Sequence, residues 1–251
     1  RTYGTGTGGV RMLTGTTALH RDLECEIAAF KDVEAALTFG SGYLANLAVV
    51  AALVGPRDRV LLDARAHRSL HDACVLARVP VTILPHNDIS AVERELRCAP
   101  AGHRTLIVVD GLYSMDGDIC PLPELVELKR RYNAFLLVDE AHSLGVLGRT
   151  GRGVHEHFGI AADAADVWTG SLSKAVPSNG GFVAGRRDLI LYLQHASAPF
   201  WFSAALGPAA AGAALAALRV ARREPERFEV LRRNADALRV GLRMRGYDTG
   251  N

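Results

Sequence analysis

The sequence has few cysteines and little net charge, and each shortage excludes a class of protein. Its four cysteines, Cys25, Cys74, Cys98 and Cys120, show neither a CxxC pair nor the spacing of zinc ligands. They predict reduced thiols in a cytoplasmic protein. The 29 basic and 27 acidic residues leave a net charge of +2, with no long run of either sign. This balance argues against a nucleic acid or a membrane surface as a partner recognised by charge.

Long hydrophobic runs are missing as well. The most apolar stretch, residues 204–221, contains Gly207, Pro208 and Gly212 and ends in arginines. It predicts a packed helix and no membrane span. The N-terminus lacks the charged-then-apolar pattern of a signal peptide, and both ends of the sequence are abrupt. We therefore expect a piece of a longer chain.

Lysine is rare among the basic residues. Only Lys31, Lys129 and Lys174 are lysines, and the other basic residues are arginines. Where composition favours arginine for charge alone, the positions that stay lysine are enriched in sites that need an amine. This pattern singles out three candidates without choosing between them.

Apolar runs of strand length alternate with segments of helical period over most of the chain. Runs such as LIVVD at 106–110 are continuous, as in strands buried on both faces. The alternation predicts an α/β fold with a mainly parallel sheet flanked by helices. We expect strands at residues 35–39, 59–63, 79–84, 105–110, 135–139, 167–169 and 181–184, and two late helices at 208–222 and 225–245.

The N-terminal segment contains a GxGxxG pattern at Gly4, Gly6 and Gly9. A dinucleotide site requires a strand before this pattern and a helix directly after it. Nothing strand-like precedes these glycines, and the first helical period begins several residues later. The pattern therefore predicts a glycine-rich turn.

One predicted strand ends in an acid that is followed closely by a histidine. Asp139 ends the run FLLVD and His142 comes three residues later, at the edge where ligands gather in parallel sheets. A carboxylate buried there needs a cation or several hydrogen-bond donors. The alternative is that Asp139 caps the next turn and that His142 is a polar loop residue.

Another strand leads into a loop that holds Lys174. The surrounding serines and glycines let a ligand approach the backbone closely, although a solvated loop lysine is the simpler alternative. The turn FGSGYLAN offers the backbone N–H groups of Gly42 and Tyr43 to an anion, or else forms an ordinary helix start capped by Ser41. His67, which follows the strand at 59–63, is either a site residue or a loop residue.

Six segments follow one another in a specific order: GTGGVRMLTGTTALHRDLE, SGYLAN, DARAHRSL, DGLYSMDGD, LLVDEAHSLGVLGRTGRG and TGSLSK. Together they resemble the α-oxoamine synthase family of fold-type I enzymes, which use pyridoxal 5'-phosphate (PLP). The resemblance covers nearly the whole chain. It implies a PLP-binding large domain over residues 1–222, then a linker helix and the start of a truncated C-terminal domain over 223–251.

The resemblance also implies roles for particular residues. Lys174 matches the lysine that carries the cofactor covalently, and Asp139 matches the carboxylate that pairs with the pyridine nitrogen. His142 matches a histidine that contacts the phenolic oxygen and the substrate, and His67 one that stacks on the ring. The remaining matches are Ser114 near the phenolic oxygen, Gly42, Tyr43 and Ser171 at the phosphate, and Ser203 at the phosphate of a neighbouring subunit.

The reaction implied by the resemblance is a decarboxylative condensation. Glycine, alanine or serine would react with an acyl thioester, acyl-CoA or acyl carrier protein, and give an α-amino ketone and CO₂. The enzyme would be a cytoplasmic homodimer with its active sites at the interface. A PLP aminotransferase of the same fold and a non-catalytic partner subunit are the alternatives. Ser173, where glycine is usual, and Ala66 and Arg68 around His67 depart from the family pattern and leave the subfamily open.

Overall fold

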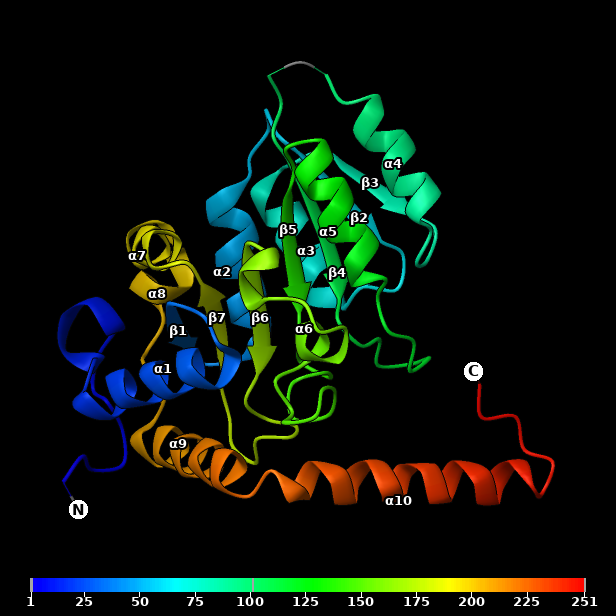
Figure 1. Cartoon of the computed structure of the whole chain (residues 1–251). Helices are drawn as coiled ribbons and strands as arrows, with labels where there is room; N and C mark the ends of the chain where they lie inside the picture. The colour runs from blue at the N-terminus through cyan, green and yellow to red at the C-terminus, as the bar shows by residue number, and fades with distance from the viewer. Residues whose placement is uncertain (1, 101, 251) are drawn as a thin grey trace.

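Seven strands form one sheet in the computed structural model, which describes residues 2–100 and 102–250 (Figure 1). The strand order is β1-β7-β6-β5-β4-β2-β3. Neighbouring strands from β3 to β6 pair in parallel, whereas β7 is antiparallel to both of its neighbours. The strands are β1 (Ala35–Phe39), β2 (Arg59–Asp63), β3 (Val81–Leu84), β4 (Thr105–Asp110), β5 (Phe135–Asp139), β6 (Val167–Ser171) and β7 (Gly181–Gly185).

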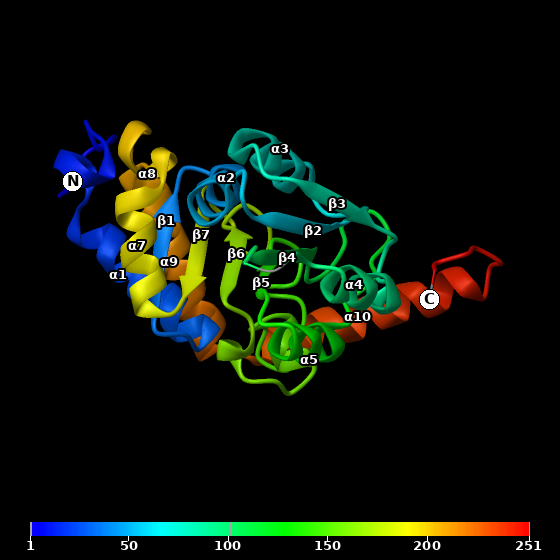
Figure 2. The ribbon, with the colours of Figure 1, turned by 90° about the horizontal axis from the view of Figure 1, so that it is seen from above.

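Helices cover both faces of the sheet, as the view from above shows (Figure 2). One apolar core lies between the sheet and α2, α3, α7 and α8, and the other lies between the sheet and α1, α4, α5 and α9. Successive side chains of a strand alternate between the two cores: Leu137 packs in the first and Val138 in the second. The helices are α1 (Ala18–Lys31), α2 (Gly42–Leu53), α3 (Arg68–Ala77), α4 (Ile89–Arg97), α5 (Leu122–Arg131), α6 (Val154–His157), α7 (Arg187–Ala196), α8 (Ala198–Phe202), α9 (Pro208–Arg223) and α10 (Glu226–Arg243), with a π-helical turn η1 (Arg11–Gly15) and a 3₁₀ turn η2 (Ala162–Ala164).

The predicted α/β fold with a mainly parallel sheet is confirmed, with small changes at element ends. The strand expected from residue 79 begins at Val81, and the strand expected to end at residue 169 continues to Ser171. The one antiparallel strand, β7, follows β6 after a loop of nine residues, 172–180. A connection this short cannot make the crossover that a parallel neighbour requires, so the chain turns back beside β6. Lys174 lies in this loop.

The two ends of the described chain differ in how they contact the sheet. The short π-helical turn η1 begins two residues after Gly9, and the first α-helix, α1, begins only at Ala18, as expected for a glycine-rich turn in place of a dinucleotide site. At the other end, α9 packs along α1, whereas α10 extends away from the sheet (Figure 1). Phe228 is the buried residue of α10. Among the described residues, no helix has both the length and the apolar character needed to cross a membrane.

Candidate functional site

A pocket of about 190 Å³ opens at the carboxyl ends of the central strands. Parallel strands present these ends at one edge of the sheet, where the loops that follow can enclose a ligand. The structure brings seven of the nine predicted site residues together there. The lining residues are Ser41, Gly42, Tyr43, Asn46, His67, Asp110, Asp139, Ala141, His142, Ser171, Ser173 and Lys174.

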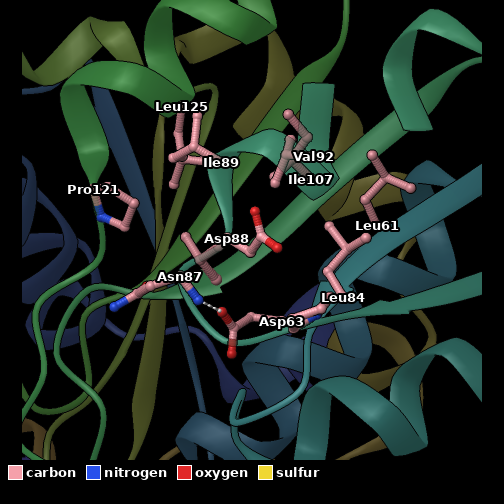
Figure 3. A pocket seen from close by; sticks show the side chains of 12 residues that line it. Leu61, Asp63, Leu84, Asn87, Asp88, Ile89, Val92, Ile107, Pro121 and Leu125 are labelled. Carbon is pink, nitrogen blue, oxygen red and sulfur yellow. Dashed lines mark hydrogen bonds between the residues drawn. The ribbon is translucent and has the colours of Figure 1, made fainter. Parts of the chain in front are cut away.

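A second hollow lies beside β2 and β4 and is drawn in Figure 3. At its mouth the backbone N–H of Asn87 donates to Asp63 Oδ2 at 2.8 Å. The side chains around it are mainly aliphatic, such as Leu61 and Ile107. Its volume of about 10 Å³ has room for roughly one water molecule. The pocket that contains Lys174 is the candidate site, because it gathers seven of the predicted site residues.

Asp139 lies at the end of β5 and is 4% exposed. Its Oδ2 accepts a hydrogen bond from the Asn46 side-chain amide at 2.7 Å, and its Oδ1 accepts one from the Ala141 N–H at 2.8 Å. Two donors of this kind stabilise an ionised carboxylate in a buried position. The structure thus favours a buried, charged Asp139 that faces the pocket.

His67 is connected to Asp139 through two polar side chains. The Nδ1 atom of His67 lies 2.7 Å from Ser69 Oγ, and the Ser69 N–H donates to the same nitrogen at 3.3 Å. The Asn46 amide donates to Ser69 Oγ at 2.8 Å as well as to Asp139. Because Nδ1 accepts, the other ring nitrogen carries the proton when the imidazole is neutral. These contacts fix the orientation of the His67 ring at the pocket.

Lys174 and His142 also line the pocket. Lys174 is exposed and comes from the loop between β6 and β7, so its amine is accessible to a ligand. Burial, and then the positive charge of Lys174, lower the pKa of His142 below its ordinary value. His142 is therefore favoured as a neutral imidazole at neutral pH, a form that can accept or donate a proton.

The N-terminus of α2 closes one end of the pocket. Ser41 caps the helix by accepting the Leu44 N–H at 3.1 Å, and this leaves the N–H groups of Gly42 and Tyr43 at the pocket. A side chain on Gly42 would come within 3.3 Å of Ser171 Cβ and of a backbone oxygen. The α2 N-terminus and the hydroxyl of Ser171 form a site suited to an anion. The Ser41 cap is present, and phosphate binding by Gly42 and Tyr43 stays a prediction.

Two predicted residues lie outside the pocket. Ser114 is exposed in the turn after β4, and Ser203 follows the end of α8. Neither side chain lines the cavity. Their roles remain predictions, and that of Ser203 concerns a neighbouring subunit.

Five lining residues were not predicted as site residues, and two of them, Asp110 and Asn46, are buried and contact predicted ones. The other three are Ser41, Ala141 and Ser173. Asp110 ends β4, pairs in register with Asp139 on β5 and is 3% exposed. Asn46 is 2% exposed on α2 and bridges Ser69 and Asp139. The signal for Asp110 was present, because LIVVD ends in an acid as FLLVD does. Asn46 ends the SGYLAN segment of the resemblance, but its contacts with Ser69 and Asp139 join segments far apart in the sequence.

Comparison of the sequence with known proteins identifies its family. The family described as aminotransferase class I and II matches residues 4–250. The chain belongs to this family. It is 42% identical over 248 residues to an 8-amino-7-oxononanoate synthase from Thermosipho melanesiensis, and 46% identical over 250 residues to one from Geobacter sulfurreducens. These matches cover 99% and 98% of the chain and 63% of each relative, so the chain spans less than two thirds of their length.

The fold is also similar to that of solved PLP-dependent enzymes. A serine palmitoyltransferase from Sphingomonas wittichii superposes with a TM-score of 0.94 at 35% identity, over 98% of this chain and 61% of that one. A serine palmitoyltransferase variant from S. paucimobilis, solved with a bound PLP–myriocin aldimine, has a TM-score of 0.94 at 36% identity, over 98% of this chain and 62% of that one. The resemblance to the α-oxoamine synthases of PLP fold type I is confirmed.

The residues of the pocket fit PLP. The cofactor has an aldehyde, a ring nitrogen that is cationic when protonated, and a phosphate. The pocket has an accessible amine on Lys174, a buried carboxylate on Asp139 and an anion site at the start of α2. Each of these three groups therefore has a chemically matched partner on this chain.

Proposed function

We propose that this chain is the cofactor-binding part of an α-oxoamine synthase that condenses a small amino acid with an acyl thioester and releases CO₂. The observation that carries the proposal is the shared pocket of Lys174, Asp139 and the N-terminus of α2. The named relatives support a synthase over an aminotransferase of the same fold. The presence of Lys174 argues against a non-catalytic partner subunit.

Four groups of this chain would hold the cofactor. Lys174 Nζ would bind its aldehyde carbon, and Asp139 would pair with its ring nitrogen. The N–H groups of Gly42 and Tyr43, with the hydroxyl of Ser171, would bind its phosphate. When bound, PLP supplies an electron sink for the bonds at the amino acid's Cα.

The other site residues would orient the reactants and move protons. Lys174, once displaced by the substrate amine, would take the proton from the amino acid's Cα through its Nζ atom. His142, favoured in its neutral form, would donate a hydrogen bond to the substrate. His67 would stack on the face of the cofactor ring, held there by Ser69.

The setting of the enzyme is part of the proposal. Residues 1–222 would be the PLP-binding domain, with 223–251 as a linker helix and the start of a C-terminal domain. A homodimer is supported by two apolar side chains on contacting elements, Leu13 on η1 and Phe202 on α8, which are 78% and 84% exposed. Ser203 would then face the partner's phosphate site. The four cysteines are free, which supports a cytoplasmic location.

Product analysis tests the reaction. The intact protein, loaded with PLP, is supplied with glycine, alanine or serine and with acyl-CoA or an acyl carrier protein. We expect release of CO₂ that depends on both the amino acid and the thioester. Conversion of the amino acid without a thioester and without CO₂ would instead identify an aminotransferase.

Covalent labelling tests the lysine independently of turnover. Borohydride reduction of the PLP-loaded protein should attach the cofactor to the peptide that contains Lys174, and the substitution Lys174→Ala should abolish the label. Lys129→Arg is the matched control, because Lys129 already pairs with Asp166 at 2.7 Å and its charge is kept. A label on Lys31 or Lys129 would overturn the assignment.

A further inference from the structure

Three buried acids lie at the carboxyl ends of neighbouring strands. Asp63 ends β2, Asp110 ends β4 and Asp139 ends β5, and β4 is the middle strand of the three. Their exposed fractions are 5%, 3% and 4%. Asp110 and Asp139 line the same pocket, whereas Asp63 lines the other hollow. Two ionised carboxylates in one pocket would repel each other, and burial raises the cost of each charge.

The hydrogen-bond donors are distributed unequally among these acids. Asp63 accepts from the N–H groups of Arg65 and Asn87, both at 2.8 Å, and contacts His86 Nδ1 at 2.9 Å. Asp139 accepts from Asn46 and from the backbone. Asp110 accepts only the His67 N–H, at 3.2 Å, among the hydrogen bonds of the described residues. The middle acid therefore has the least support for a negative charge.

We propose that Asp110 holds a proton beside an ionised Asp139, so that the floor of the pocket carries one negative charge instead of two. Two carboxyl groups that share a site commonly divide their charge in this way. The proton goes to Asp110 because the two donors of Asp139 already stabilise the ionised form of that residue. If the proposed function holds, this single negative charge matches the single positive charge of the protonated ring nitrogen of PLP.

The pKa of Asp110 supports this assignment. Burial, and then the charge of Asp139, raise the pKa of Asp110 to about 8. The Asp63 carboxylate on β2 raises it further, whereas the His67 N–H and the Lys174 ammonium lower it. Asp110 therefore keeps its proton at neutral pH and loses it above about pH 8.

Side-chain carbon NMR of the intact, cofactor-free protein with labelled aspartate tests the inference without turnover. We expect one aspartate carboxyl to titrate in the neutral-to-alkaline range and this signal to be missing from Asp110→Asn. A spectrum in which every aspartate carboxyl titrates below about pH 5 would overturn the proposal. A failure to release CO₂ would count against the proposed function and would leave this result unaffected.

Matched amide substitutions give a second test. Asp110→Asn imitates a protonated acid, so its melting temperature at neutral pH should equal or exceed that of the unmodified protein. Its dissociation constant for PLP should change by less than about threefold, whereas Asp139→Asn should weaken PLP at least roughly 30-fold, as expected for loss of a buried charge partner. Asp63→Asn is the control for stability and should lower the melting temperature, because Asp63 has three partners. Equal loss of PLP in Asp110→Asn and Asp139→Asn would show that both acids are ionised.

Discussion

Two acids that are adjacent in the sequence face opposite sides of the sheet. Asp139 is the last residue of β5 and points into the pocket, where it has two donors and an open side toward a ligand. Glu140 follows it and points toward α1 and α6, into a cluster that has no opening. Each acid has a lysine on its own side, Lys174 near the first and Lys31 at the second.

The cluster around Glu140 is complete without a ligand. Lys31 and Ser143 both donate to the Glu140 carboxylate, and Lys31 also donates to His155 Nδ1 at 2.7 Å and to the Arg152 backbone oxygen at 3.0 Å. The Lys31 ammonium lies 3.7 Å from the centre of a Trp168 ring. Lys31 and Glu140 have fully buried side chains. Burial lowers the pKa of Lys31, although Glu140 opposes this effect.

The comparison shows that accessibility separates the two lysines. Both belong to a residue type that is rare in this chain. Each lies near one of the two adjacent acids: Lys174 near Asp139, and Lys31 at Glu140. The amine of Lys31 has all its hydrogen-bond partners within the protein and serves the fold. The amine of Lys174 is exposed in a pocket, and only that amine can bind a ligand.

The largest effect is expected from breaking the closed cluster. Lys31→Met leaves Glu140 buried without its cation, and loss of one partner of a buried ion pair typically costs about 3–5 kcal/mol of folding free energy. Urea unfolding of the intact, cofactor-free protein measures this cost. Lys174→Met is the matched control and should change the free energy of unfolding by less than about 0.5 kcal/mol, because Lys174 is exposed.

Addition of Glu140→Gln to Lys31→Met separates charge from packing. We expect the double variant to recover part of the lost stability, because a neutral amide is cheaper to bury than an unpaired carboxylate. A single variant Lys31→Met as stable as the control would show that the cluster is not required for folding.

A smaller effect is expected on the open side of β5. Asn46→Ala removes a donor from Asp139, and hydrogen bonds to charged groups contribute about 1.5–3 kcal/mol. The dissociation constant for PLP should therefore rise by at least roughly tenfold. Asn87→Ala is the control, because Asn87 is an amide of the other hollow (Figure 3) and should leave PLP binding unchanged. An unchanged PLP affinity in Asn46→Ala would mean that Asp139 needs no support from α2.

The closed cluster should also respond to acid. Burial, and then the charges of Lys31 and Arg152, lower the pKa of His155 from its ordinary 6.5 to about 3. The folded protein keeps His155 neutral, whereas the unfolded chain takes up a proton below pH 6.5. The stability that His155 contributes is therefore complete above pH 6.5 and is lost as the pH falls toward 3, by at most about 1.4 kcal/mol per pH unit.

Urea unfolding at pH 7 and pH 5 measures this dependence. The variant His155→Asn should flatten it, and His157→Asn, which changes an exposed residue of the same short helix, should not. If both variants keep the full pH dependence, another group is responsible.

The residues of the open pocket could be predicted from the sequence better than those of the closed cluster around Glu140. Asp139, Lys174 and the start of α2 could be predicted because each stands beside a strand end or a glycine-rich turn, and such local patterns fix where a side chain lies. Lys31 could not be placed, because its partner Glu140 is 109 residues away in the chain. The place of Asp110 at a strand end could be predicted, but its single donor could not, because the His67 N–H lies 43 residues away in the chain.

The smallest effect concerns the ring of His67, on the open side of the comparison. If His67 stacks on the cofactor, His67→Ala removes an aromatic contact of about 0.5–1.5 kcal/mol, and PLP affinity should fall roughly 2- to 12-fold. His67→Phe keeps the ring and should retain most of the affinity, although Ser69 loses its contact with Nδ1. Equilibrium titration of the intact protein with PLP resolves a difference of this size. Equal losses in the two variants would show that His67 acts through the hydrogen bonds of its ring nitrogens. The ring would then serve contacts within the protein and would not stack on the cofactor.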